Sequence, residues 1–195
     1  RLFTRHTFAQ DNTAPVRFPG GPALTPLDSI YLSNLPALSM PAAMRQDPLP
    51  PVVDNSLTPY LRPVFGQEGA SCGQACLVGY NFTYEMDRYR NLNADSLENQ
   101  YATHFTYNFM NGGNGWFGVS YFHSMEVLRL CGNMNCVDYG GTYYDNGSRW
   151  ITGYDVYYNA MHNRIRGAYR IHTGTEEGIM TLKHWINDHL EGSPI

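Results

Sequence analysis

Cys72, a cysteine that follows a glycine-rich segment, is the residue of this chain best suited to covalent chemistry. It comes directly after Ser71, where we expect a helix to begin, and Gln67 stands five residues earlier. The first turn of a helix carries unpaired N–H groups and the positive end of the helix dipole, so it favours a thiolate. The Cys72 N–H and the Gln67 amide could then hold an oxyanion, while Gly73 leaves space for a substrate backbone. This pattern predicts nucleophilic attack on a carbonyl carbon.

Three further cysteines leave alternatives open. Cys76 lies one turn deeper in the expected helix, where its N–H should bond to the Cys72 carbonyl and its side chain should pack. Cys131 and Cys136 flank a turn-like stretch, and they could form a disulfide or remain two free thiols. The spacings of four and five residues within the two cysteine pairs do not match a C-x2-C zinc motif. We therefore expect no metal and no other cofactor.

The helix that would carry Cys72 has a clear start signal. Ser71 and Gln74 match the S-x-x-Q pattern of a capping box, in which the two side chains satisfy backbone N–H groups reciprocally. Apolar residues then recur at steps of three and four, as they do on one buried face of a helix. This stripe consists of Ala75, Val78, Phe82, Met86 and Tyr89.

The same reasoning predicts further helices along the chain. The second helix is expected over 95–111, with Glu98 as its cap. The third should end at Gly132, and the fourth should begin around Thr175. Another helix is indicated over 153–163. Strand signals are weak, so the chain should be mostly helical. The stripes of the second, third and fourth helices are Leu97, Tyr101, Phe105 and Phe109; Phe122, Met125 and Leu128; and Ile179, Leu182, Ile186 and Leu190.

Composition divides the chain near residue 48 and excludes some classes of partner. Residues 1–48 combine many prolines with no sustained periodicity, which indicates an N-terminal extension that wraps the surface, links to another part or is disordered. Residues 49–195 carry the helical pattern of one domain. With a net charge of −4 and no basic face, the chain is not expected to bind nucleic acid. No apolar run approaches the roughly 18 residues of a membrane span, so no transmembrane segment is expected.

Several short motifs follow one another in a characteristic order. They are Pro63-Val64-x-x-Gln67-x-Gly69-x-Ser71-Cys72, Asn91-Leu92-Asn93 with Ser96, Asn111-Gly112-Gly113 with Gly115-Trp116, and Asp138-Tyr139-Gly140-Gly141. In order and spacing they resemble segments of the papain-like cysteine proteases, the C1 peptidases, in their bacterial form. The first is similar to the active-site segment, and the glycine pair is similar to the segment that lines the substrate cleft. The resemblance covers about 49–195.

The resemblance implies an α+β fold, of which this chain would hold the helical, left-hand half while the β-barrel half is largely missing. It implies a peptidase in which Cys72 attacks peptide bonds, Gln67 helps to hold the oxyanion, and Gly112, Gly113 and Gly73 contact a peptide or protein substrate. The family's histidine and asparagine lie about 130 to 150 residues beyond the cysteine. They are therefore expected beyond Ile195, in the C-terminal half of the same protein, or on a partner chain.

The histidines within the chain leave a second reading open. None is followed by the Ala-Val or Ala-Ile that accompanies the family's base, although any of them could approach Cys72 in a different fold. The alternative is a non-catalytic papain-like scaffold that acts as a binding or assembly subunit of a secreted or cell-surface complex. Family habit and the low-charge, tyrosine-rich composition favour that location. A helical domain unrelated to peptidases would require the helix not to begin at Ser71. The histidines are His6, His104, His123, His162, His172, His184 and His189.

Overall fold

The structure, a computed structural model, describes residues 24–40, 47–143 and 149–188. Most of the predicted extension 1–48, together with His6, His189 and Leu190, lies outside the described residues. The described part is mostly helical, as predicted, and it contains no β-strand, only two isolated bridges between Ala37 and Arg170 and between Tyr101 and Asn135. Its α-helices are α1 (Pro26–Asn34), α2 (Cys72–Gln74), α3 (Thr83–Arg90), α4 (Thr103–Met110), α5 (Tyr121–Leu130), α6 (Cys136–Tyr139), α7 (Tyr154–Ala160) and α8 (Glu176–Asp188). The remaining helical segments are η2 (Asn55–Leu57), η3 (Ala75–Phe82) and η5 (Met161–Asn163).

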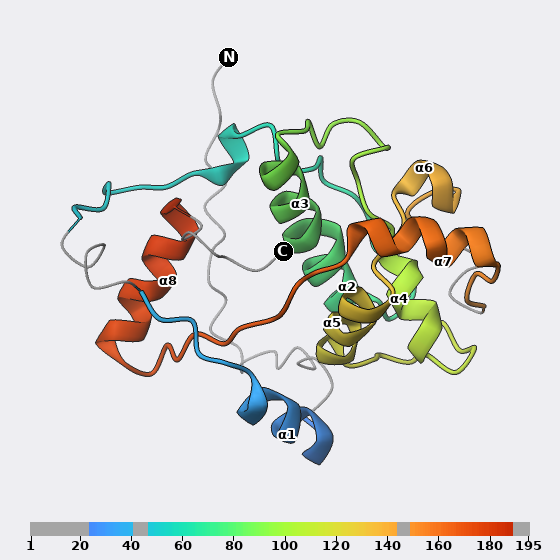
Figure 1. Cartoon of the computed structure of the whole chain (residues 1–195), viewed down its shortest axis with the longest axis horizontal. Helices are drawn as coiled ribbons and strands as arrows, with labels where there is room; N and C mark the ends of the chain where they lie inside the picture. The colour runs from blue at the N-terminus through green and yellow to red at the C-terminus, as the bar shows by residue number, and fades with distance from the viewer. Residues whose placement is uncertain (1–23, 41–46, 144–148, 189–195) are drawn as a thin grey trace, which may run out of the picture.

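One continuous helix, 72–90, forms the centre of the molecule and is called the central helix below. It consists of α2, a π-helical segment η3 and α3, and the residues at both junctions keep right-handed helical dihedral angles. The helix α8 lies on one side of it, whereas α4, α5 and α7 lie on the other (Figure 1). Cys72 is therefore the first residue of the longest helical run among the described residues.

The predicted start of this helix is confirmed, but the predicted capping box is wrong. Ser71 occupies the N-cap position, yet its hydroxyl donates to the Glu68 carbonyl at 2.7 Å and caps no helix N–H. The Gln74 side chain is buried, and its amide donates to the Ser124 hydroxyl on α5 at 3.0 Å. A local bond to the preceding turn and a tertiary bond to α5 have replaced the two reciprocal bonds of a capping box, so the pattern marked the right residue for a different reason.

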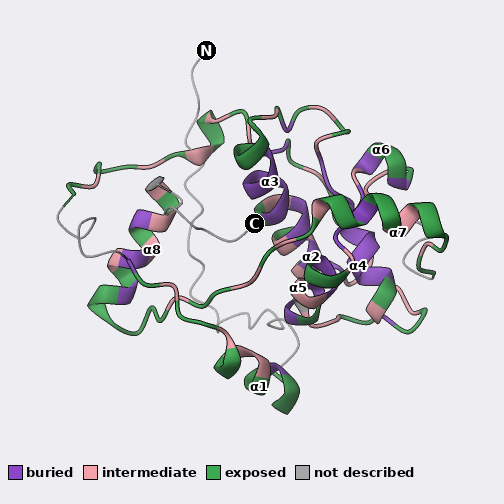
Figure 2. Cartoon of the chain, viewed as in Figure 1, coloured by how far each residue is buried: buried purple, intermediate pink, exposed green. Residues whose placement is uncertain are grey.

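The buried core lies where the central helix meets α4, α5, α6 and α7. Val78, Phe82 and Met86 of the predicted stripe are buried, as expected, whereas Tyr89 at its end is 66% exposed. Figure 2 shows the buried residues concentrated in the central helix and in α4 and α5. The two apolar clusters are Val78, Phe82, Met86, Tyr101 and Leu128, and Ala102, Phe105, Val127, Met134, Cys136, Tyr139 and Ala160.

The predicted second helix begins later than expected. Residues 95–100 form turns and bends with Leu97 and Glu98 exposed, so no helix begins here for Glu98 to cap. The backbone of this stretch bonds to other segments, because the Tyr101 N–H donates to the Thr83 hydroxyl and the carbonyl of Gln100 accepts from a distant backbone N–H. These tertiary bonds compete with the i to i+4 ladder, and the helix starts only at Thr103.

The ends of the remaining helices agree with the predicted signals. Helix α5 ends before Gly132, which has the left-handed φ of +74° expected of a C′ residue. Helix α8 begins at Glu176, one residue after the predicted start, and α7 lies within the range 153–163. Among the described residues, no helix is both long and apolar enough to cross a membrane.

Helix α1 is an element that the sequence reading missed, because it lies inside the proline-rich extension. Its start carries a complete capping box between Thr25 and Asp28, with Pro26 at the first helical position. The buried Asp28 carboxylate also accepts from the Ser120 hydroxyl at the start of α5. The extension therefore contains at least one ordered segment that packs on the domain.

Candidate active site around Cys72

The structure exposes the predicted nucleophile. Cys72 is a free, solvent-exposed cysteine at the first position of the central helix. Its N–H has no acceptor within the helix, because the first four N–H groups of a helix lack partners four residues earlier. Cys76, one turn further, is also free and exposed, so the prediction that it packs is wrong. Burial does not distinguish the two thiols, but position does, because only Cys72 lies at the helix terminus.

Gly115, in the loop after α4, anchors the segment that leads into Cys72. The Ala70 N–H donates to the Gly115 carbonyl at 3.0 Å. Gly69 has a left-handed φ of +64°, and a Cβ atom there would lie 2.3 Å from the Gly115 carbonyl oxygen. Only glycine fits this approach without displacement. The structure thus joins the predicted Cys72 segment to the predicted glycine segment around Gly112 and Gly113.

Tyr107 of α4 fixes the same carbonyl from the protein interior. Its buried hydroxyl lies 2.6 Å from the Gly115 oxygen and 2.9 Å from the Phe117 oxygen, so it donates into the glycine loop. Burial raises the pKa of this hydroxyl, and hydrogen bonding to Ala70 and Asn111 offsets part of the rise. Tyr107 therefore supports the glycine loop at the carbonyl to which the Cys72 segment is bonded.

His104, one turn before Tyr107 on α4, contacts the Cys72 segment from below. It is completely buried, and its Nε2 lies 3.2 Å from the Glu68 carbonyl oxygen. Because a carbonyl can only accept, this hydrogen bond requires the proton on Nε2. The ring packs 5.1 Å from the Tyr107 ring and 4.9 Å from the Tyr143 ring, measured between centroids. In this conformation His104 supports the loop and does not reach solvent.

Gln67, predicted as an oxyanion donor, is exposed and lies on the same loop. Its amide nitrogen donates to the Gly69 carbonyl at 3.2 Å. The amide is therefore used within the loop in this conformation, and its side chain would have to rotate to reach a substrate bound at Cys72. Gly73, the other neighbour of the nucleophile, is half-buried in α2.

Gly112 and Gly113 form the turn that ends α4, with left-handed φ values of +64° and +81°. The Asn111 side chain accepts from the Gly113 N–H at 2.9 Å and fixes the turn. The two glycines line a groove of about 560 Å³, which is also lined by Phe109 and Trp150, whose rings meet edge-on with centroids 4.5 Å apart. The predicted substrate-contacting glycines therefore face an open groove.

The remaining cysteines and histidines belong to other parts of the molecule. Cys131 and Cys136 are free thiols in the structure, and burial raises the pKa of each. His123 lies 3.9 Å from Asp28, where α1 meets α5. His162, after α7, has its Nδ1 on the Tyr158 carbonyl, and His184 is buried within α8. Of the described histidines, His104 contacts the Cys72 segment.

Sequence reasoning did not predict that two α4 side chains, His104 and Tyr107, support the Cys72 segment. His104 was considered only as one of seven histidines that could approach Cys72 in a different fold, and Tyr107 was not singled out at all. The available signal was their spacing of three residues, which places both on one face of α4, just before the Gly112-Gly113 turn.

Comparison with known proteins identifies no relative of this chain. No protein-family model matches this chain, and neither a curated protein nor a solved structure is found to be similar to it.

Proposed function

We propose that this chain carries the nucleophile of a papain-like cysteine peptidase, with Cys72 as the attacking residue. The observation that supports this function best is the position of Cys72, an exposed free thiol at the first residue of the continuous helix 72–90. The unpaired N–H groups of this helix terminus could hold an oxyanion that forms beside the Cys72 sulfur.

The chemistry would follow the usual course of thiol acyl transfer. The Cys72 sulfur attacks the peptide carbonyl carbon, and the oxygen that becomes negative is held by the Cys72 N–H. Collapse of this intermediate breaks the C–N bond and forms a thioester, while a base passes its proton to the leaving amine. Water then hydrolyses the thioester and restores the thiol. Gln67 would join the oxyanion hole after its amide leaves the Gly69 carbonyl.

The general base would be a histidine outside the described residues, further along the polypeptide or on a partner chain. His104 contacts the correct segment, but its ring is enclosed and its Nε2 hydrogen bonds to Glu68. A base must reach both the thiol and the leaving group, which requires access to the substrate side of Cys72. Together with that outside segment, the groove beside Gly112 and Gly113 would receive an extended peptide, since neither residue has a side chain to obstruct a backbone.

Labelling with a thiol-reactive peptide epoxide tests the proposal. The complete protein should incorporate one epoxide and cleave peptide substrates, and Cys72→Ala should abolish both. Cys76→Ala is the matched control, because it removes another exposed free thiol from the same helix, and it should retain both activities. If Cys76→Ala abolishes labelling while Cys72→Ala retains it, the assignment of the nucleophile is wrong.

A second candidate function is a binding or assembly subunit of a secreted or cell-surface complex that uses the same scaffold without catalysis. The large apolar side chains around the site favour it, because Val64, Trp116 and Phe117 are 93%, 84% and 63% exposed. Exposed aromatic residues of this kind are common at interfaces with partners. A complete protein whose Cys72 is inert toward the epoxide, while Trp116→Ala weakens its assembly, would favour this reading.

A further inference from the structure

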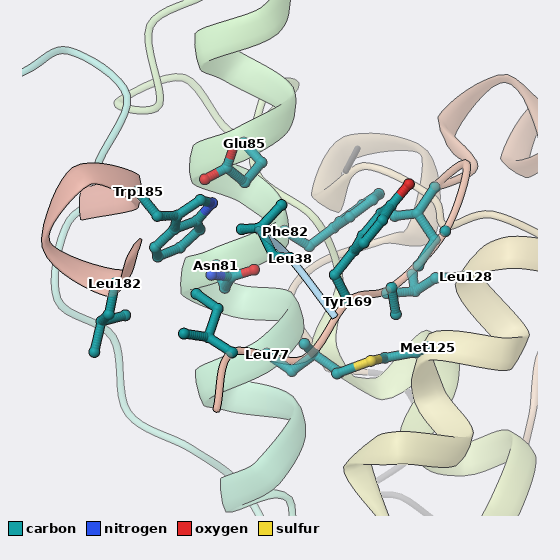
Figure 3. A pocket seen from close by; sticks show the side chains of 14 residues that line it. Leu38, Leu77, Asn81, Phe82, Glu85, Met125, Leu128, Tyr169, Leu182 and Trp185 are labelled. Atoms are coloured by element: carbon teal, nitrogen blue, oxygen red, sulfur yellow. The ribbon is translucent and has the colours of Figure 1, made fainter. Parts of the chain in front are cut away.

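The segment 164–171, which connects η5 to α8, lines two different hollows. The first is apolar and lies against the central helix, α5 and α8, and Figure 3 shows Tyr169 of this segment and Met125 of α5 directed toward it. Arg164 and Arg166 instead line a second hollow, of about 440 Å³, at the end of α5. The second hollow is called the arginine hollow below. Its lining consists of Arg129, Met161, His162, Arg164, Ile165 and Arg166.

Contacts between the end of α5 and the segment around η5 fix the backbone of the arginine hollow. The Ile165 N–H donates to the Leu128 carbonyl at 3.3 Å. Gly132, just after α5, has a left-handed φ of +74°, and a Cβ atom there would overlap the Ala160 carbonyl group. Only glycine therefore allows the two chain segments to approach so closely. The side chains of the hollow extend from a fixed backbone, which lowers the entropic cost of binding a ligand.

Positive charge is concentrated in the arginine hollow, whose described lining contains no aspartate or glutamate. It holds three of the 13 lysine and arginine residues of a chain with a net charge of −4. Arg166 is exposed and forms no hydrogen bond or ion pair with another residue that the structure describes. Within the same residues, Arg164 uses only its Nε, which donates to the Met161 carbonyl at 3.2 Å. The Nη groups of both arginines therefore remain available to a ligand.

The negative groups near the arginine hollow already have partners. The Glu126 carboxylate accepts from Nε and Nη2 of Arg129 at 3.1 and 2.8 Å, so these two charges offset each other. The carbonyls at the end of η5 would oppose an anion, because the C-terminus of a helix is its negative end. The His162 carbonyl, however, accepts from Arg90 at 2.9 Å. The positive charge that remains in the hollow belongs to Arg164 and Arg166.

We propose that the arginine hollow binds the phosphate group of a small phosphate monoester. A guanidinium group presents a planar fork of donors that matches the oxygens of a phosphate. A phosphate monoester carries close to two negative charges above its second pKa of about 6, and Arg164 and Arg166 together supply two positive ones. A carboxylate or a sulfate ester would supply only one. The hollow is of the size that holds a small molecule, so the organic part would lie against Met161, which is 42% exposed, and Ile165.

Isothermal titration calorimetry at low ionic strength with phenyl phosphate and phenyl sulfate tests the proposal. Phenyl phosphate should bind the complete protein about tenfold more tightly, because the second charge strengthens the hydrogen bonds from the arginines. Inorganic phosphate should bind more weakly than phenyl phosphate, because it lacks the apolar ring. Equal affinity for phenyl phosphate and phenyl sulfate, or no binding of either, would overturn the proposal. A phosphotyrosine peptide that binds more than about tenfold more tightly than phenyl phosphate would instead identify a phosphorylated protein as the ligand.

Substitutions of single arginines locate the binding. Arg164→Gln and Arg166→Gln should each weaken binding of phenyl phosphate about tenfold. Arg170→Gln is the matched control, because it removes an exposed arginine of the same segment that does not line the hollow, and it should retain the affinity. An equal loss in Arg170→Gln would mean that the anion is attracted without a site. Cys72→Ala should also retain the affinity, so this proposal and the proposed peptidase activity can fail separately.

A methyl signal inside the arginine hollow gives a second measurement that needs no change of charge. The resonance of the Met161 methyl group, identified by its loss in Met161→Leu, should shift when phenyl phosphate is added, because the aromatic ring would lie against it. Arg166→Gln should reduce this shift at the same probe concentration. An unshifted Met161 resonance at saturating phenyl phosphate would place the probe elsewhere and overturn the proposal.

Discussion

The Tyr107 hydroxyl donates to the Gly115 carbonyl oxygen at 2.6 Å, and this contact joins the buried helix α4 to the loop that is bonded to the Cys72 segment. The same carbonyl accepts from the Ala70 N–H at 3.0 Å. The Cys72 segment is thus held by the glycine loop, which is held in turn by α4. Substitutions at Gly69 or Tyr107 should therefore change the reactivity of the Cys72 thiol without altering the helix that carries it.

Gly69→Ala should destabilise the protein and change the reactivity of the Cys72 thiol. A non-glycine residue at a φ of +64° costs on the order of 1 to 3 kcal/mol, and the added Cβ would meet the Gly115 oxygen at 2.3 Å. We expect a matching loss in the free energy of unfolding, measured by urea denaturation, and an altered rate of Cys72 labelling by iodoacetamide. Gly66→Ala is the control, because no atom lies within 4 Å of a Cβ there. Equal effects of the two variants would contradict the proposed fit.

Tyr107→Phe should loosen the segment while leaving the core packed. The ring keeps its contact with His104, but the carbonyls of Gly115 and Phe117 lose a donor, at a cost of about 1 to 2 kcal/mol. Hydrogen exchange at the Ala70 N–H should accelerate. Tyr154→Phe removes a hydroxyl from a tyrosine that is 80% exposed and should change neither quantity. Unchanged protection of Ala70 in Tyr107→Phe would mean that the loop does not depend on this hydroxyl.

The start of the Cys72 helix could be predicted from sequence because several signals agree at one residue. The polar Ser71 precedes an apolar stripe of helical period, and three of its members, Val78, Phe82 and Met86, are buried. The capping box was not predictable in the same way. The Ser71 hydroxyl bonds backwards to Glu68, outside the helix, and the Gln74 amide bonds to a residue 50 positions away.

Local patterns also misplaced the start of α4 and did not predict the contact of His104 with the Cys72 segment. The stretch after Asp95 resembles a capped helix, but its Tyr101 N–H bonds to Thr83, 18 residues earlier. The contact between Glu68 and His104 likewise joins residues 36 positions apart. Side-chain periodicity reports which face of an element is apolar and not which distant backbone group a polar side chain will reach.

His104→Phe should separate the supporting role of this residue from a catalytic one. Phenylalanine keeps the ring packing against Tyr107 and Tyr143 but cannot donate to the Glu68 carbonyl, so we expect a loss of about 1 kcal/mol in stability. Labelling of Cys72 by the peptide epoxide should persist. His162→Phe, at an exposed histidine, serves as the control. Abolished labelling in a folded His104→Phe variant would instead make His104 the base.

A buried carboxyl group on α3 should make stability depend on pH. Asp87 is completely buried, and neither of its oxygens has a hydrogen-bond partner within the described part of the chain. Burial raises its pKa from the ordinary value of 3.8 to about 7, and the positive charge of Arg90 offsets only part of this rise. Between these two values the folded protein keeps a proton that the unfolded chain has lost. Stability contributed by this proton is therefore present at low pH and is lost as the pH rises toward about 7.

Asp87→Asn should remove this dependence, because an amide does not titrate in this range. In the wild-type protein, Asp87 should lower the free energy of unfolding by at most about 1.4 kcal/mol per pH unit across the window, on top of the slope from all other groups. Urea denaturation from about pH 4 to about pH 8 should give a flatter profile for Asp87→Asn than for the wild type. Asp95→Asn, at an exposed carboxylate, should follow the wild type. Parallel profiles for Asp87→Asn and the wild type would show that Asp87 is ionised or solvated in the folded protein, because only a proton held differently by the two states produces such a slope.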